Sequence, residues 1–349
     1  IHSPWEIYGR RSLLARTSKN YLIISAHNES RNIGSVISRI PSDIDCVVIV
    51  DDGSSDETAR IAHDFLERSK FKYVILKHQK NTGQGSARAT GAIFALQRCL
   101  KNENCILDTS RGALSKPTTH DILIFSDGDG QLDPHDAPKF IDVILNNGAD
   151  FVKGDRFSTP DLLRIMPKTR LFGNVVLSAI TKMASGYWDL TDSQCGYFAI
   201  KSKTALKLNW ANLRMGYGQI NEIVIRLNEV NARVSSVPID AVYGVGEVSG
   251  IRIRKVSIPI LSLCARGFFR RILVKHIIWK SHPLAAFYLF GNILVFAGLT
   301  LGTKVMFDLF AGFTAPPLTS ILVMSLMSLG MLSIFQGVAL DLTENRLLH

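Results

Sequence analysis

Two aspartates with one glycine between them form the pattern in this sequence that is best suited to hold a metal ion. Asp127 and Asp129 follow the apolar run 122–125, and Gly128 lies between them. In an extended chain, residues i and i+2 point to the same side, so both carboxylates can face one ligand. Gly128 allows close approach to the backbone, and hard divalent cations prefer such oxygens and bridge them to substrate phosphates. The pattern predicts a catalytic metal site for Mg²⁺ or Mn²⁺ at Asp127 and Asp129.

Two further polar clusters follow apolar runs in the same way. Residues 26–29, with the sequence Ala-His-Asn-Glu, follow the run 21–25, and the acidic stretch 51–56 follows the run 46–50. Ligands of parallel sheets bind beyond the carboxyl ends of the strands. We therefore expect both clusters to join residues 127–131 in one acidic, glycine-containing site.

The elements that must position these clusters alternate along the chain. Strand–helix alternation indicates an α/β fold with a mostly parallel sheet that is covered by helices on both faces. Residues 101–120 show no clear periodicity and predict a polar loop or an insertion. The expected strands are 21–25, 46–50, 73–76, 122–125 and 151–152, and the expected helices are 33–40, 57–67, 86–100 and 136–145.

Two uncharged apolar stretches lie near the end of the chain, at residues 284–303 and 318–340. Each is about as long as the roughly 20 residues that a helix needs to cross the hydrocarbon core. Lys304, Asp308 and the pair Pro316-Pro317 lie between them and predict a short turn outside the bilayer. The alternative, two buried core helices, is disfavoured because such long uncharged runs are rare in soluble proteins.

The chain is basic, with a formal net charge of +10 and a pI of about 9.4. Many cations precede the first apolar stretch, whereas the predicted turn carries only Lys304, so the positive-inside rule places the N-terminal part and the C-terminus in the cytoplasm. Residues 258–280 mix cations with large apolar side chains, as helices in a membrane interface do. Anionic lipid therefore explains the basic charge better than nucleic acid does. The cations are Arg252, Arg254, Lys255, Arg266, Arg270, Arg271, Lys275 and Lys280.

The five cysteines are scattered and form no C-x-x-C motif. They indicate neither a cysteine zinc site nor a disulfide framework, and they fit a reducing compartment.

Several segments, in this order and spacing, resemble family 2 glycosyltransferases of the GT-A fold. The similarity is to the branch of dolichol-phosphate mannose synthase and the polyprenyl-phosphate glycosyltransferases. The segments are SAHNESRNI, VIVDDGSSDET, NTGQGSARATGA, DGDGQLDP, KGDRF, MPKTRLFGN and TDSQCGYFAI.

The resemblance implies roles for individual residues. Asp127 and Asp129, with Gln131 beside them, would hold metal and diphosphate, and Asp192 would line the acceptor side and orient the acceptor or act as a base. His27 replaces a common Tyr and Asp155 a common Asn, and the role of Glu222 stays open. The implied nucleotide-binding residues are Ala26, His27, Asn28, Glu29, Asp52, Gly85 and Gly128, and the implied acceptor-phosphate residues are Arg156, Arg170, Asn174 and Gln194.

Arginine suits the acceptor role on physical grounds. Its guanidinium stays charged and binds phosphate with two parallel hydrogen bonds. The alternative for Arg156 and Arg170 is ordinary surface pairing with Asp155 or Asp161.

The expected activity is inverting sugar transfer from a nucleotide-diphosphate donor to a polyprenyl phosphate, dolichyl or undecaprenyl, at the cytoplasmic face of the membrane. A UDP-sugar is favoured, GDP-mannose stays possible, and a homo-oligomer is left open. The alternatives are a processive polysaccharide synthase, whose usual Q-x-x-R-W motif does not occur in the sequence, and a non-catalytic membrane scaffold. The expected organisation is an extension (1–20), a GT-A catalytic domain (21–250), amphipathic juxtamembrane helices (251–282) and a transmembrane hairpin with tail (283–349).

Overall fold

The computed structural model describes residues 18–96, 105–108, 120–158, 168–214, 216, 218–241, 253–279, 282–314 and 316–348. Most of the predicted N-terminal extension and residues 242–252 lie outside these ranges. The chain divides into two units, residues 1–267 with 348–349, and residues 268–347. The boundary falls within helix α10 (Ile253–Arg271), inside the segment that the sequence predicts to be juxtamembrane.

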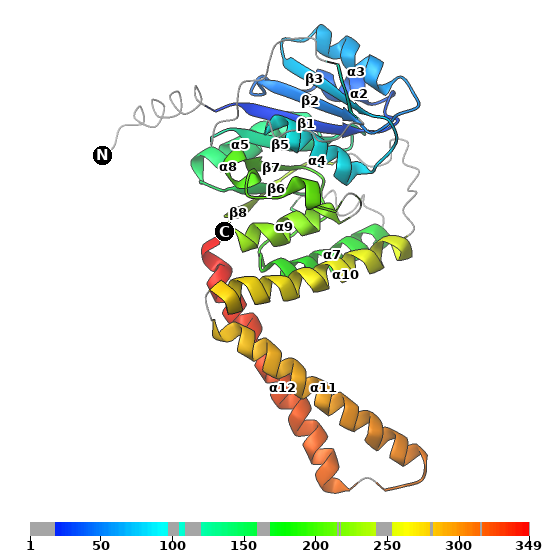
Figure 1. The fold of residues 1–349 in the computed structure, drawn as a ribbon, viewed down its shortest axis with the longest axis vertical. Coiled ribbons are helices and arrows are strands. Elements are labelled where there is room, and N and C mark those ends of the chain that lie inside the picture. Colours follow the sequence, from blue (N-terminus) through cyan, green and yellow to red (C-terminus); the bar gives the residue numbers. More distant parts are fainter. Residues whose placement is uncertain are drawn as a thin grey trace, which may run out of the picture. The chain divides into compact units, whose positions relative to one another are not determined.

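The first unit contains an eight-stranded sheet with the order β4-β3-β2-β1-β5-β7-β6-β8 (Figure 1). The neighbours β3-β2-β1-β5 are parallel, as are β6 and β8, whereas β4 and β7 pair antiparallel with their neighbours. The predicted mixed α/β fold with a mostly parallel sheet is therefore confirmed. The strands are β1 (Asn20–Ala26), β2 (Cys46–Asp51), β3 (Lys72–His78), β4 (Cys105–Asp108), β5 (Ile122–Asp127), β6 (Phe151–Asp155), β7 (Phe198–Lys201) and β8 (Val234–Pro238).

Helices cover both faces of this sheet. Leu22 and Ile24 of β1 face one core, which α2, α3 and α5 cover, whereas Tyr21 and Ile23 face a second core that includes α4 and α9. The alternation follows from the period of two along a strand. The helices of this unit are α2 (Ile33–Ser38), α3 (Thr58–Glu67), α4 (Gln84–Ala95), α5 (Ala137–Asn146), α7 (Lys168–Ser185), α8 (Ser202–Ala205) and α9 (Gln219–Glu229), with 3₁₀ turns η1 (Pro134–Asp136) and η2 (Trp210–Asn212).

The structure differs from the sequence-based expectation in several elements. The expected loop 101–120 contains the strand β4, which pairs with β3 at the sheet edge, and its remaining residues except His120 lie outside the described part. Strands β7 and β8 and helices α7 and α9 were not predicted. β7 is only four residues long and has no clear alternation, so only its pairing between β5 and β6 defines it.

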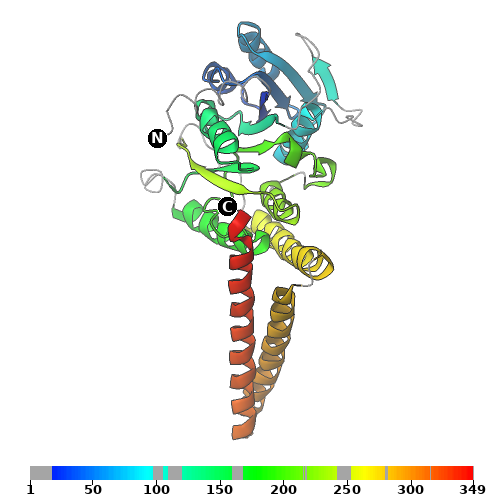
Figure 2. The same ribbon diagram turned by 90° about the vertical axis from the view of Figure 1, so that its left-hand side faces the viewer.

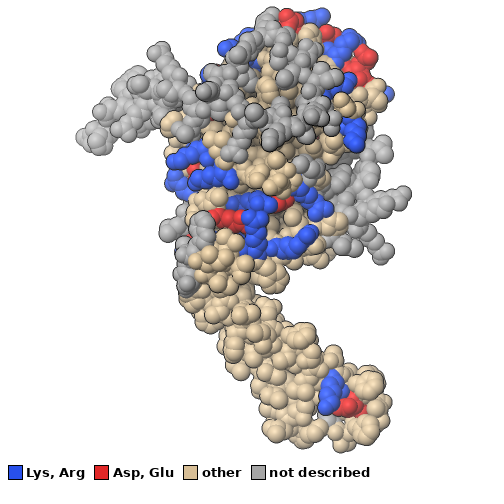
Figure 3. Space-filling model, in the orientation of Figure 1, with Lys and Arg blue, Asp and Glu red and all other residues tan. Residues whose placement is uncertain are grey.

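The second unit contains α11 (Pro283–Phe310) and α12 (Pro317–Asn345), both long and apolar enough to span a membrane. Most of their large apolar side chains are exposed, unlike those of core helices, and Figure 3 shows an almost uncharged hairpin surface. A Cβ built on Gly291 would lie 2.9 Å from the carbonyl oxygen of Gly330, so the helix backbones approach closely. The prediction that Lys304 and Asp308 lie in a turn is wrong, because α11 continues through both.

A π-helix, η3 (Ile272–Trp279), follows α10 and precedes α11, and a final 3₁₀ turn, η4 (Arg346–Leu348), follows α12. Figure 2 gives a second view of these elements. The location of α10 and η3 in a membrane interface stays a prediction.

Candidate active site

Hydrogen bonds tie together the loops that follow β1 and β2. The backbone N–H of Asn28 donates to Ser54 Oγ, and that of Ser55 donates to Asn28 Oδ1, both at 2.9 Å. Asn28 has a φ of 57°, in the left-handed region where asparagine is one of the few tolerated side chains. The Glu29 N–H donates to Thr58 Oγ1 at 2.8 Å. These bonds bring the first two polar clusters together at one edge of the sheet.

Hydrogen bonds to Asp52 connect the segment between β3 and α4 to the carboxyl end of β2. Its carboxylate accepts bonds from the N–H groups of Thr82, at 3.0 Å, and Gly83, at 2.7 Å, and His78 Nδ1 lies 2.7 Å away. Burial by itself raises the pKa of Asp52, but the bonds from His78, Thr82 and Gly83 outweigh it and hold the pKa at about 2. Asp52 therefore shapes the predicted nucleotide pocket, whereas its direct contact with a nucleotide stays a prediction.

Replacing Asp52 by Asn is expected to destabilise the protein by about 2 kcal/mol at neutral pH, because its pKa falls from 3.8 to about 2 on folding. The folded-state pKa is the lower one, so this contribution is complete above the unfolded-state pKa and is lost as the pH falls towards 2. The difference between the thermal midpoints of wild type and the Asp52→Asn variant should therefore shrink as the pH of the measurement is lowered. The control is Asp64→Asn, which changes a carboxylate that is 45% exposed. A difference in thermal midpoint between wild type and Asp52→Asn that does not change with pH would contradict the expectation.

Asp127 ends β5 and is ion-paired. Nη2 of Arg88, on α4, donates to its two carboxylate oxygens at 2.9 and 3.1 Å, and Ser25 Oγ donates to Oδ1 at 3.0 Å. The side chains of Arg88 and Asp127 are 5% and 13% exposed. Sequence reasoning missed Arg88, whose alanine-rich helical surroundings give no signal of a charged site.

The loop after Asp127 lies against the end of β1. The Gly128 N–H donates to the Ser25 carbonyl at 2.9 Å, and a Cβ built on Gly128 would lie 3.0 Å from the Ala26 Cβ. Any larger residue would therefore push the loop away from β1. The backbone N–H of Gln131 donates to Asp129 Oδ1 at 3.0 Å, so the loop also fixes this carboxylate.

The chemistry of this loop fits a hard divalent cation. Asp129 and Asp127 offer carboxylate oxygens two residues apart, and magnesium in proteins is commonly held by one or two carboxylates together with substrate phosphates. Because Asp127 already accepts bonds from Arg88, we expect Asp129 to be the main ligand, with Asp127 helping directly or through water. The half-buried Gln131 lies beside them, and its part as a ligand stays a prediction.

Gly196 brings the predicted acceptor segment up to the metal motif. A Cβ built there would lie 2.4 Å from Asp127 Oδ2 and 2.9 Å from Arg88 Nη2. The backbone of Gly196 therefore lies directly against the Asp127–Arg88 pair, a contact that sequence reasoning did not identify.

Replacing Gly196 by Ala is expected to displace the Asp127 carboxylate and to lower the transfer rate by roughly 100-fold, about the cost of an ångström-scale misplacement. The matched control is Gly216→Ala, because no atom lies within 4 Å of a Cβ built on Gly216. Initial rates of the two variants at saturating donor test this. Equal rates would show that the Asp127–Arg88 pair tolerates displacement.

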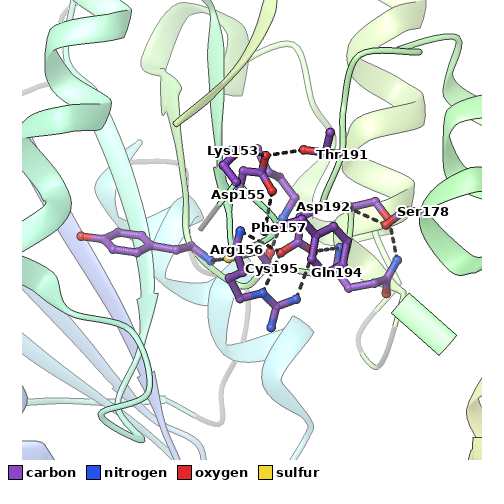
Figure 4. A network of polar contacts seen from close by, with 12 residues as sticks. Lys153, Asp155, Arg156, Phe157, Ser178, Thr191, Asp192, Gln194 and Cys195 are labelled. Atoms are coloured by element: carbon purple, nitrogen blue, oxygen red, sulfur yellow. Dashed lines mark hydrogen bonds and ion pairs between the residues drawn. The ribbon is translucent and has the colours of Figure 1, made fainter. Parts of the chain in front are cut away.

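Arg156 and Asp192 form a buried ion pair, drawn in Figure 4. Arg156 Nε donates to Asp192 Oδ2 at 2.6 Å and Nη2 donates to Oδ1 at 3.0 Å, and the two side chains are 8% and 0% exposed. Burial raises the pKa of Asp192, but the charge and hydrogen bonds of Arg156 outweigh it, so the pKa is lowered. The pairing of Arg156 with Asp192 was not among those considered from the sequence, and Asp161 lies outside the described residues.

The segments around this pair form one polar network, which Figure 4 also shows. Lys153 is fully buried and donates to the carbonyl oxygen of Cys195, and its burial lowers its pKa to about 8. Asp155 accepts bonds from the Phe157 N–H at 2.8 Å and from the Thr191 hydroxyl. Asp155, which replaces a common Asn, is thus a structural link between the two segments.

The remaining predicted acceptor residues are Gln194, Asn174 and Arg170. Gln194 is half-buried and donates to Ser193 Oγ at 2.6 Å. Asn174 is half-buried on α7, and Arg170 lies in the same helix with a side chain outside the described part. Their contacts with a lipid phosphate stay predictions.

The remaining predicted nucleotide-binding residues also lie in the first unit. Burial raises the pKa of Glu29, which accepts a bond from Asn32 Nδ2 at 2.8 Å. His27 is half-buried. The carbonyl oxygen of Gly85, in the first turn of α4, accepts a bond from Gln219 Nε2 at 2.6 Å.

Glu222, whose role the sequence leaves open, has structural partners. Its carboxylate accepts bonds from Arg226 at 2.6 and 2.9 Å and from the backbone N–H of Arg214 at 2.8 Å. These contacts fix the segment before α9.

The fold is that of known nucleotide-sugar enzymes. Glucosyl-3-phosphoglycerate synthase of Mycobacterium tuberculosis, solved with Mn²⁺, UDP and glucosyl-3-phosphoglycerate, matches with a TM-score of 0.52 at 17% identity, over 76% of this chain and 86% of that one. At this identity the likeness shows the fold alone, and it is the GT-A fold.

Sequence comparison identifies the family. A model of glycosyl transferase family 2 matches residues 21–100. The chain is 34% identical over 236 residues to the UDP-N-acetylglucosamine–dolichyl-phosphate N-acetylglucosaminyltransferase of Methanococcus voltae, which covers 64% of this chain and 85% of that relative. It is 25% identical over 166 residues to the dodecaprenyl-phosphate galacturonate synthase of Rhizobium johnstonii, over 46% of this chain and 42% of that relative. The chain belongs to family 2 of the glycosyltransferases.

Proposed function

We propose that this protein transfers a sugar from a UDP-linked donor to a polyprenyl phosphate, with N-acetylglucosamine as the first sugar to test. The observation that carries the proposal is the 34% identity to the N-acetylglucosaminyltransferase of M. voltae, which extends over 85% of that relative. The geometry is compatible with it, because the acidic loop and the Arg156–Asp192 network belong to one unit and meet at Gly196.

The reaction forms one bond and breaks one bond at the anomeric carbon. An oxygen of the lipid phosphate attacks this carbon while the bond to the diphosphate breaks, and UDP leaves with the electron pair. A single displacement from the opposite face inverts the configuration. A divalent ion held by Asp129 and Asp127 would supply charge neutralisation for the departing diphosphate.

The acceptor side needs positioning more than it needs a base. The second pKa of a phosphate monoester is near 6, so the attacking oxygen is already an anion at neutral pH. Asp192 has a lowered pKa and is bound by Arg156, so we assign it to holding that arginine. Arg156, with Arg170 and Asn174, would orient the lipid phosphate, and orientation of this kind contributes much of a rate enhancement.

The proposed acceptor is a membrane lipid, so the protein is expected to be attached to the membrane. We infer that α11 and α12 anchor the chain, with the catalytic unit and the C-terminus on the cytoplasmic side. The support is the contrast between cations such as Arg266 and Arg270 before α11 and the single Lys304 near the hairpin tip.

A labelling experiment tests the proposal. Membranes that contain the protein are incubated with radioactive UDP-N-acetylglucosamine, UDP-glucose or GDP-mannose, together with Mg²⁺ or Mn²⁺. Lipid-extractable label from a UDP-sugar is expected. Label retained in polymer would support the processive synthase, and label only from GDP-mannose would reject the proposed donor.

A further inference from the structure

Two histidines and a glutamate come together in the second unit, outside the nucleotide site. His276 lies in η3, His282 caps the start of α11, and Glu344 lies in the last turn of α12. One ligand atom from each residue lies within 4.8 Å of the other two. The cluster therefore joins the beginning and the end of the helical hairpin.

His276 is the member of this cluster that most needs an explanation. Its side chain is 0% exposed, and neither ring nitrogen makes a hydrogen bond within the described part of the chain. Its Nδ1 lies 3.0 Å from Oε2 of Glu344. A buried polar group left without a hydrogen bond costs about 1–3 kcal/mol, and a bound ion is one of the recognised explanations for such a group.

We propose that His276, His282 and Glu344 bind one divalent transition-metal ion, zinc being the best match, which fastens the start of α11 to the end of α12. Zinc accepts imidazole nitrogens and carboxylate oxygens at about 2.0–2.2 Å, and water can complete four-coordination. At those bond lengths tetrahedral ligands lie about 3.3 Å apart. The observed 3.0 Å between His276 Nδ1 and Glu344 Oε2 is close to that spacing, and the ligand atom of His282, within 4.8 Å of the other two, has to move inward to reach it.

The neighbouring charges are compatible with an added cation. Arg271 donates to both carboxylate oxygens of Asp341, at 2.7 and 2.9 Å, and Lys275 donates to Asn345 Oδ1 at 3.1 Å. These buried contacts hold the end of α10 and η3 beside the end of α12. The positive charges of Arg271 and Lys275 are balanced by Asp341 and Glu344, so the site does not start with an excess of positive charge.

Metal binding would replace one existing contact of His282. Its Nδ1 accepts a hydrogen bond from the Leu284 N–H at 3.3 Å, which caps α11. A metal on either ring nitrogen removes this bond, because the metallated ring keeps its remaining proton on the other nitrogen. The bond is long, and losing a helix cap costs only about 1 kcal/mol, whereas zinc sites contribute several times that amount.

The test uses the full-length protein in detergent, with an excess of Mg²⁺ to occupy the acidic loop at Asp127 and Asp129. Zn²⁺ or Co²⁺ is added, loosely bound metal is removed by dialysis, and the retained metal is counted by mass spectrometry. Wild type is expected to keep one ion per chain, and bound Co²⁺ to show the strong visible absorption of a four-coordinate site. His276→Asn, His282→Asn and Glu344→Gln should each weaken binding at least about 100-fold, since even outer-sphere changes cost 10–100-fold.

The matched control is His63→Asn, which removes a histidine that is 39% exposed on α3 and should retain the metal like wild type. Thermal midpoints in the presence of a chelator establish that each variant is folded, and any one folded variant of the three decides the question. No retained metal in wild type, or the same retention in wild type and all variants, would overturn the proposal. Sugar transfer is measured separately and does not enter this test.

Discussion

Replacing Asp129 by Ala is expected to lower sugar transfer by about 10³-fold while the protein stays folded. In this account Asp129 is the main ligand of the cation that neutralises the departing diphosphate. Such Lewis-acid stabilisation is worth several kcal/mol, and about 4 kcal/mol corresponds to 10³-fold in rate. Asp129 is half-buried and is not part of the apolar cores, so its loss should cost little stability.

The matched control for Asp129→Ala is Asp142→Asn, which changes an exposed carboxylate on α5. Initial rates at saturating donor and acceptor are compared across a range of Mg²⁺ or Mn²⁺ concentrations. The Asp129 variant should need far more metal or show no response to it. Wild-type rates in that variant would remove the acidic loop from the mechanism.

Breaking the Arg156–Asp192 pair is expected to have the largest effect on stability. Arg156→Ala leaves the fully buried Asp192 without its guanidinium partner, and the loss of one partner of a buried pair typically costs about 3–5 kcal/mol. Arg60→Ala is the matched control, because Arg60 is 64% exposed and its pairs with Glu57 and Asp64 lie on the surface. Exposed pairs contribute at most about 1 kcal/mol. The thermal midpoints of both variants are measured in detergent, and Arg156→Ala should lower the midpoint far more than Arg60→Ala does.

Asp192→Asn separates a positioning role from that of a general base. If Asp192 holds Arg156, this variant should raise the KM for polyprenyl phosphate more than it lowers kcat. The acid limb of its pH–rate profile should still follow the acceptor phosphate, near pH 6. A kcat loss of several orders of magnitude with an unchanged KM would instead assign the proton transfer to Asp192.

The sequence was sufficient to predict which clusters meet at the sheet edge. The clusters after β1, β2 and β5 follow strands that pair in parallel, with Ser25 opposite Asp127 and Ala26 opposite Asp51. Strand ends in a parallel sheet share an edge, so their position in the sequence determines their position in space. The two apolar helices were predicted for a similar reason, because length and hydropathy define a span.

The residues that sequence reasoning missed act through contacts between distant segments. Arg88 lies in an alanine-rich helix, and only the packing of α4 against the sheet brings it to Asp127. Gly196 gives no local signal, because its small size matters only where Asp127 approaches its backbone. The partner of Arg156 could not be deduced either, since Asp155 and Asp161 are far closer along the chain than Asp192.

Purified full-length protein, UDP-N-acetylglucosamine, dolichyl phosphate and Mg²⁺ or Mn²⁺ provide the most direct test of the central claim. Mass spectrometry of both products identifies which bond is broken. Free UDP and a lipid that gains one sugar on its single phosphate are expected, with neither formed when the divalent metal is chelated. Release of UMP with a diphosphate-linked lipid, or transfer that continues without metal, would contradict the claim.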